Sequence, residues 1–150
     1  MLTASGRSPV RQPHLEPRLV LLVAAGGAVG SGARYLLAQA VPVRDGWPYA
    51  TLGANVLGAF LLGLLLETLV HRGPETRRAR DVRLAAGTGA LGGLTTFSGL
   101  ALEVERLLAA GSVGTAAAYA ITSVVLGVVV CLAGVRIASR RATRRSGRVS

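Results

Sequence analysis

A few polar side chains lie inside otherwise apolar stretches of the sequence, where polar groups are costly and tend to mark function. Asn55 carries an amide with two donors. Tyr119 and Ser123 stand four residues apart, so both hydroxyls share one helix face. Such groups could bind an ion, and Arg34 could raise the anion concentration at an entrance. Structural roles are the alternatives: a hydrogen bond between helices for Asn55, and snorkelling to headgroups for Arg34.

The run from Gly89 to Gly99 combines glycines with two adjacent threonines, which is poor material for a continuous helix. We predict a break between Gly92 and Thr96. A break would free backbone carbonyls and amides at mid-membrane, where protein or a polar cavity must satisfy them. In broken helices the carbonyls face cations and the half-helix N-termini face anions. The alternative is a flexible packing kink.

Four apolar segments must position these residues. The length of each is close to the roughly 20 residues that a helix needs to span a bilayer. Of the 150 residues 51% are hydrophobic and 16% are charged, whereas a soluble domain has about 25% charged residues. A single cysteine excludes a disulfide scaffold. The connections are short, so consecutive segments should be antiparallel neighbours. We predict an all-α integral membrane protein with four transmembrane helices, the third broken near its middle, from the segments Leu19–Val43, Tyr49–Val70, Leu84–Leu102 and Gly114–Val135.

The domain boundaries follow from these segments. Residues 19–137 form the transmembrane domain. Residues 1–18 are polar and proline-containing, which indicates a disordered arm rather than a signal peptide. Residues 138–150 are rich in arginine and serine and are expected to be a disordered basic tail.

The placement of arginine predicts the orientation. The net charge is +10 and all 17 basic residues are arginines. Fourteen of them lie in the two termini and the second loop, against two, Arg44 and Arg106, on the opposite side. The positive-inside rule then predicts a multi-pass protein of the cell membrane with both termini cytoplasmic. The basic tail is interpreted as a topology signal near anionic membrane lipid, and no nucleic-acid partner is expected.

Three motifs together resemble the Fluc (CrcB) family of fluoride channels. They occur in order and at family spacing over about residues 19–135. A weaker match, Tyr119 and Ser123, lies in the last segment. The three motifs are Gly26–Tyr35, Thr51–Phe60 and Gly92–Ser98, the last followed by Glu103.

This resemblance implies an antiparallel dimer of four-helix subunits with two fluoride pores, which export fluoride passively and keep its cytoplasmic concentration low. It also implies one structural sodium ion at the dimer centre, held by backbone carbonyls of Gly92 and Thr95. The phenyl ring of Phe97 could face an anion edge-on, because the edge of an aromatic ring is partially positive. Arg34 and Glu103 would lie at a pore mouth. The fluoride pathway would comprise Asn55, Thr96, Phe97, Ser98, Tyr119 and Ser123.

One stretch departs from the family pattern. After the first phenylalanine the family has Ser-Thr-Phe-Ser, but this chain has Ser98-Gly99-Leu100-Ala101. The second phenylalanine and two hydroxyls are missing. Together with the arginine bias, which should fix one orientation, this predicts a heterodimer with a paralogous, inverted subunit whose intact phenylalanine keeps one pore whole. The alternative is a dual-topology homodimer in which Leu100 is tolerated.

Other function classes explain less of the sequence. A small multidrug-type exporter would carry a glutamate in its first span, but Leu19–Val43 contains no acid. A non-transporting membrane scaffold would explain the hydrophobicity and the glycines but not three polar motifs together. We expect no enzyme, because no Ser/His/Asp set, metal-ligand cluster or membrane carboxylate pair is present.

Overall fold

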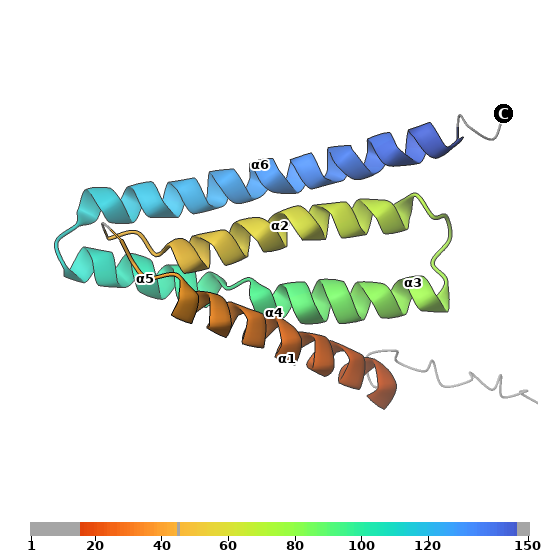
Figure 1. The fold of residues 1–150 in the computed structure, drawn as a ribbon, viewed down its shortest axis with the longest axis horizontal. Helices are drawn as coiled ribbons and strands as arrows, with labels where there is room; N and C mark the ends of the chain where they lie inside the picture. The colour runs from red at the N-terminus through yellow and green to blue at the C-terminus, as the bar shows by residue number, and fades with distance from the viewer. Residues whose placement is uncertain (1–15, 45, 147–150) are drawn as a thin grey trace, which may run out of the picture.

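The computed structural model describes residues 16–44 and 46–146, and the regular structure in them is helical. Consecutive segments run in opposite directions, as expected from the short connections (Figure 1). The start of α1, the loop after α2 and the end of α6 therefore lie at one end of the molecule. The elements are α1 (Pro17–Ala40), α2 (Tyr49–Val70), α3 (Arg77–Val82), the π-helix η2 (Arg83–Leu91), α4 (Gly92–Leu94), α5 (Phe97–Ala109) and α6 (Val113–Ser146).

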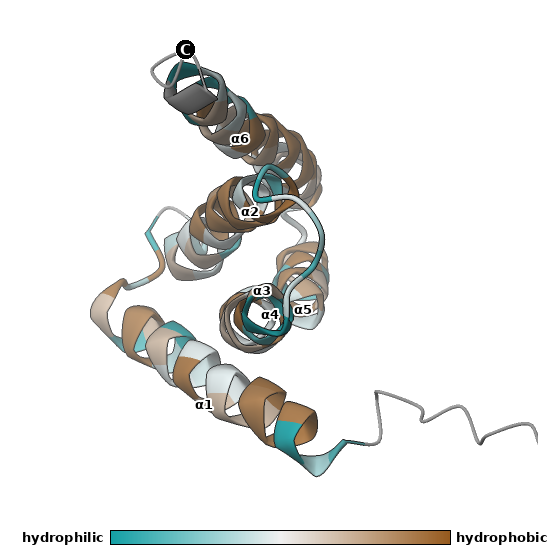
Figure 2. Cartoon of the chain, turned by 90° about the vertical axis from the view of Figure 1, so that its right-hand side faces the viewer, coloured by the Kyte–Doolittle hydropathy of each residue, from teal (hydrophilic) through white to brown (hydrophobic). Residues whose placement is uncertain are grey.

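Three helices, α1, α2 and most of α6, are long and apolar enough to cross a membrane. Their large apolar side chains face outward: Val29 is 70% exposed and Ile121 is 64% exposed. Hydrophobic colour covers most of α2 and α6 (Figure 2). Tyr119 is the one large side chain among the described residues that is fully buried. A membrane protein places apolar side chains on its lipid-facing surface and small residues between its helices. The chain has this distribution and is a multi-pass membrane protein.

The third apolar segment is divided among η2, α4 and α5. Residues 77–94 form one continuous helical rod, and α5 then resumes at Phe97. Between them Thr95 has ψ of 152° and Thr96 has φ of −151° and ψ of 117°, which is extended backbone. The helical backbone is therefore interrupted at these two residues.

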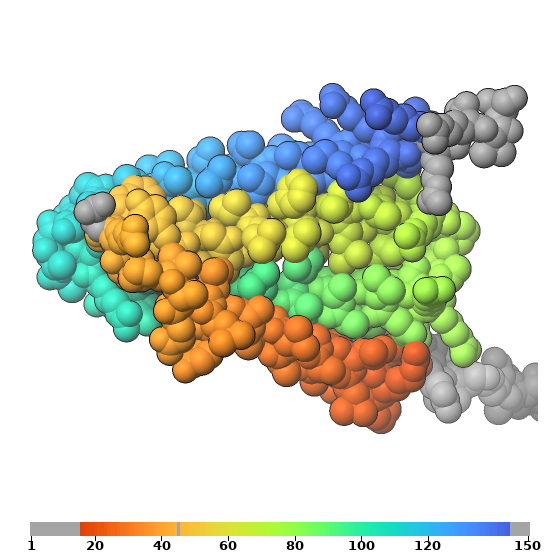
Figure 3. Space-filling model, viewed as in Figure 1, coloured from red at the N-terminus to blue at the C-terminus, as the bar shows by residue number. Residues whose placement is uncertain are grey.

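Glycines let α1 lie directly on the backbone of η2 and α4. A Cβ added at Gly30 would collide with the Ala90 carbonyl oxygen, and one added at Gly26 with the Ala85 carbonyl oxygen. Figure 3 shows the α3-to-α4 rod as a green band enclosed between α2 and α1. An ion pair of Arg18 with Asp81, 2.6 Å between Nη2 and Oδ2, joins the start of α1 to α3.

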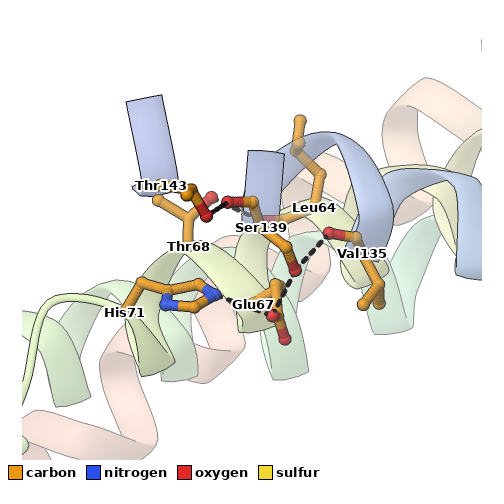
Figure 4. A network of polar contacts seen from close by, with 7 residues as sticks. All are labelled: Leu64, Glu67, Thr68, His71, Val135, Ser139 and Thr143. Carbon is orange, nitrogen blue, oxygen red and sulfur yellow. Dashed lines mark hydrogen bonds and ion pairs between the residues drawn. The ribbon is translucent and has the colours of Figure 1, made fainter. Parts of the chain in front are cut away.

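The prediction that residues 138–150 are a disordered tail was wrong for residues 138–146, because α6 continues to Ser146. The Ser139 hydroxyl donates to Glu67 Oε1 of α2 at 2.6 Å, and His71 Nε2 lies 2.9 Å from the same oxygen (Figure 4). Arginine is a good helix former, so a tertiary anchor is enough to keep these turns helical.

At the other end, α1 begins at Pro17, inside the arm predicted for residues 1–18. Proline suits the first position of a helix because it has no amide hydrogen to leave unpaired. Residues 1–15 of that arm, and residues 147–150 of the tail, lie outside the described residues.

Candidate functional site

The side chain of Asn55 on α2 holds the break between α4 and α5. Its Nδ2 donates to the Thr96 carbonyl oxygen at 3.2 Å, and its Oδ1 accepts from the Thr96 amide at 2.8 Å. The amide thus satisfies both backbone groups of Thr96, which no longer belong to a helix. Since buried backbone groups must be paired, this clamp lets the break exist inside the bundle.

The same clamp changes the hydrogen bonding of the last turn of α4. In a continuous helix the Thr96 amide would donate to the Gly92 carbonyl, but here it donates to Asn55. The Thr95 amide and hydroxyl both donate to the Leu91 carbonyl oxygen, each at 2.9 Å. The Gly92 carbonyl therefore lacks the helical donor that it would otherwise have, and the proton of the Thr95 hydroxyl is already used.

Beyond the break, α5 presents its N-terminus. The first amides of a helix have no partner within it, and the helix dipole favours negative charge there. The Thr96 hydroxyl accepts from the Gly99 amide at 3.0 Å and caps the turn. Among the described residues, the amides of Phe97 and Ser98 have no hydrogen-bond acceptor. Backbone amides at a helix N-terminus can bind an anion.

An open groove of about 440 Å³ runs past this break. Phe97 on its wall is 81% exposed, whereas Ser123 is 7% exposed. The buried Ser123 Oγ has no partner in hydrogen-bond geometry among the described residues and interacts electrostatically with the Tyr119 hydroxyl. Six of the sequence-predicted site residues line this groove together with Leu100: Asn55, Gly92, Thr95, Thr96, Phe97 and Ser123.

The remaining predicted site residues lie elsewhere. Glu103 of α5 accepts hydrogen bonds from the Thr51 hydroxyl, at 2.6 Å, and from the Tyr119 hydroxyl. Tyr119 is fully buried, so its hydroxyl is committed to this carboxylate rather than to the groove. Ser98 Oγ lies 3.2 Å from Thr96 Oγ1, beside the groove wall. Arg34 is half-buried on α1 and forms no ion pair within the described part of the chain.

Sequence reasoning missed the link of Thr51 to Glu103, which fastens α2 to α5. One signal was present: Thr51 and Asn55 are four residues apart, so one face of α2 carries both polar groups. Trp47 adds to this cluster by packing edge-on against the Tyr119 ring, with centroids 5.8 Å apart. The polar face of α2 thus serves two contacts with the third segment.

Comparison with known proteins identifies the family of this chain. Residues 21–135 match the model of the family described as CrcB-like protein, Camphor Resistance (CrcB). The chain is 46% identical over 132 residues to the fluoride-specific ion channel FluC 2 of Leifsonia xyli subsp. xyli, covering 88% of this chain and 91% of that protein. It is 49% identical over 123 residues to the fluoride-specific ion channel FluC of Phenylobacterium zucineum, covering 81% and 95%. The chain belongs to the CrcB family.

Proposed function

We propose that this chain is a subunit of a fluoride-selective channel through which fluoride leaves the cytoplasm passively. The observation that carries the proposal is the groove at the break, where the Asn55 amide, the free amides at the start of α5 and the Phe97 ring come together. The relatives named fluoride-specific ion channels support fluoride as the anion.

The chemistry of fluoride matches these groups. Fluoride is small and tightly hydrated, so a pore must replace its water with close hydrogen-bond donors. The amides of Phe97 and Ser98 are donors without an acceptor among the described residues. The buried Ser123 hydroxyl, beside that of Tyr119, has no partner there in hydrogen-bond geometry. The positive edge of Phe97 faces an anion without offering a site to larger charged species.

A passive pore is sufficient for export. Acidic surroundings supply neutral HF, which crosses the membrane and releases its proton inside, so that fluoride accumulates in the cytoplasm. A channel then lets the anion flow out down its gradient. No bond is made or broken, in agreement with a family whose named members are ion channels rather than enzymes.

A second subunit would complete the site. The groove is open on one side, Phe97 is 81% exposed beside it, and Gly92 is also exposed. Large apolar side chains elsewhere face lipid, but a ring and free amides at mid-membrane require a protein wall. An antiparallel dimer with a related chain would provide two walls and two pores.

The carbonyls of Gly92 and Thr95 fit a structural sodium ion at the centre of that dimer. Oxygen atoms suit a hard cation, and the Gly92 carbonyl has lost its helical donor because the Thr96 amide donates to Asn55. Gly92 has an ordinary helical φ of −64°, and an added Cβ would meet nothing nearer than the Gly87 carbonyl oxygen at 3.9 Å. Gly92 is therefore not required by the fold of a single chain.

This predicts a specific pattern of variants. Gly92→Val should leave the subunit helical but weaken dimerisation, because the new side chain occupies the face where a second subunit approaches. Thr95→Ala should keep sodium dependence, since the ligand is the carbonyl. Dimerisation in detergent, measured in sodium and in a large organic cation, tests both. Dimerisation of the parent chain with its partner that ignores the cation would refute the site.

The partner is proposed to be a paralogous, inverted subunit. Leu100 lines the groove, where a phenylalanine edge would be expected from the family pattern. With fourteen arginines at one end, we expect every copy to insert with both termini cytoplasmic. A C-terminal tag should thus be reached by a reagent from the cytoplasmic side alone. Equal labelling from both sides would instead support the dual-topology homodimer.

Fluoride efflux from liposomes tests the function itself. We expect fluoride release without chloride release from vesicles that contain this chain and its partner. Vesicles with this chain alone, with the partner alone and with neither are the controls. No efflux from any mixture, despite confirmed insertion and dimerisation, would overturn the assignment.

A further inference from the structure

A second pocket, of about 540 Å³, lies where α2 ends beside the last turns of α6. It is formed by the helical extension of α6 that replaces the expected disordered tail. Its residues are Thr68, His71, Arg72, Ala138, Arg141, Ala142 and Thr143.

The pocket is cationic. Arg72 lines it from the turn after α2 and Arg141 lines it from α6. Both are exposed, and neither forms an ion pair within the described residues. No acidic residue lines it among those described. The nearby Glu67 carboxylate is occupied by Ser139 and His71 (Figure 4). Two guanidinium groups therefore face the same space without a counter-ion.

The level of the pocket along the bundle indicates what it meets. α6 has 34 residues, which gives a length of about 51 Å at 1.5 Å per residue. The hydrocarbon core of a bilayer is only about 30 Å thick. α2 stops at Val70, and the pocket begins there while α6 continues. With the apolar parts of α2 and α6 in that core, the pocket is expected near the level of the lipid phosphates.

We propose that this pocket binds the phosphate of an anionic lipid headgroup. Guanidinium groups form forked, charge-assisted hydrogen bonds with phosphate oxygens. Basic pockets between transmembrane helices at the cytoplasmic side are suited to anionic headgroups. The Thr68 and Thr143 hydroxyls donate to backbone carbonyls of their own helices and shape the wall. The proposal requires a membrane-spanning chain but not fluoride transport.

Native mass spectrometry of the full chain in a neutral detergent tests the proposal. The probes are phosphatidylglycerol and phosphatidylcholine with the same acyl chains, which differ in headgroup charge. We expect phosphatidylglycerol to bind at least tenfold more tightly, and Arg72→Gln with Arg141→Gln to remove most of that preference. Arg72→Lys with Arg141→Lys should retain part of it, because the charge stays and the fork is lost.

The matched control is Arg77→Gln with Arg140→Gln, which removes the same charge from the same two regions without touching the pocket. It should keep the preference within about twofold. Equal losses in both double variants would show general surface attraction and overturn the proposal. If inorganic phosphate binds to the pocket without displacing phosphatidylglycerol, the occupant of the pocket is the free anion. That result would also overturn the lipid proposal. All four altered side chains are exposed, so folding should survive and circular dichroism confirms it.

Discussion

Asn55→Leu is expected to abolish fluoride conduction and to lower the free energy of unfolding by about 2–4 kcal/mol. Leucine has the same number and branching of side-chain heavy atoms as asparagine, so the shape of the side chain is roughly kept. The Thr96 amide and carbonyl, however, would both lose their partner at a part-buried position inside the bundle. To recover those hydrogen bonds the chain would have to close the break, and the groove would lose its free amides. Fluoride efflux and chemical denaturation in detergent measure the two effects.

Two further variants separate the clamp from other roles of an amide. Asn55→Asp keeps the acceptor for the Thr96 amide but adds a negative charge, so it should be more stable than Asn55→Leu and still block fluoride. Gln39→Leu removes an exposed amide that donates to the Tyr35 hydroxyl on α1, and it should change little. Normal efflux through a folded Asn55→Leu channel would show that the clamp is not needed.

Gly30→Ala is expected to prevent α1 from docking. The new methyl group would overlap the Ala90 carbonyl and the Leu94 amide, and both are backbone atoms that cannot rotate away. Overpacking of a core typically costs about 1–3 kcal/mol, and a contact with rigid backbone should reach the upper end or exceed it. Loss of folded protein after purification, together with faster proteolysis of the loop after α1, would report the change.

Gly32→Ala is the matched control, two residues further along the same helix. An added Cβ there meets no atom within 4 Å, so we expect wild-type yield and efflux. Alanine also has the better helix propensity, by roughly 1 kcal/mol. If the two variants behave alike, close backbone contact does not explain why α1 is rich in glycine.

The helical segments could be predicted from sequence because their signal is local. Length and apolar content identify α1, α2 and α6 without knowledge of any contact. The extended backbone at Thr95 and Thr96 also falls in a stretch of low helix propensity. Asn55 could be singled out from sequence because an amide at membrane depth requires a polar partner, and the structure places it beside the groove at Thr96.

The contacts between segments could not be predicted in the same way. Asn55 and Thr96 are 41 residues apart, and Glu67 and Ser139 are 72 apart. Nothing in the neighbourhood of Ser139 distinguishes a helix from a disordered tail, since arginine and serine occur in both. The Glu67 carboxylate on another helix decides the matter. Likewise, the spacing of Tyr119 and Ser123 indicates two hydroxyls on one helix face. It does not indicate that the Tyr119 hydroxyl donates to the Glu103 carboxylate.

The inverted distribution of side chains also determines how stability should vary with temperature. In a soluble protein, unfolding exposes apolar surface to water and raises the heat capacity, so stability has a maximum near room temperature. Here the large apolar side chains already face lipid in the folded state, and the seam between α1 and η2 is mainly glycine and backbone. Separating the helices inside a bilayer would wet almost none of that surface. We therefore expect a small heat-capacity change, a stability that falls almost linearly on warming, and no cold denaturation.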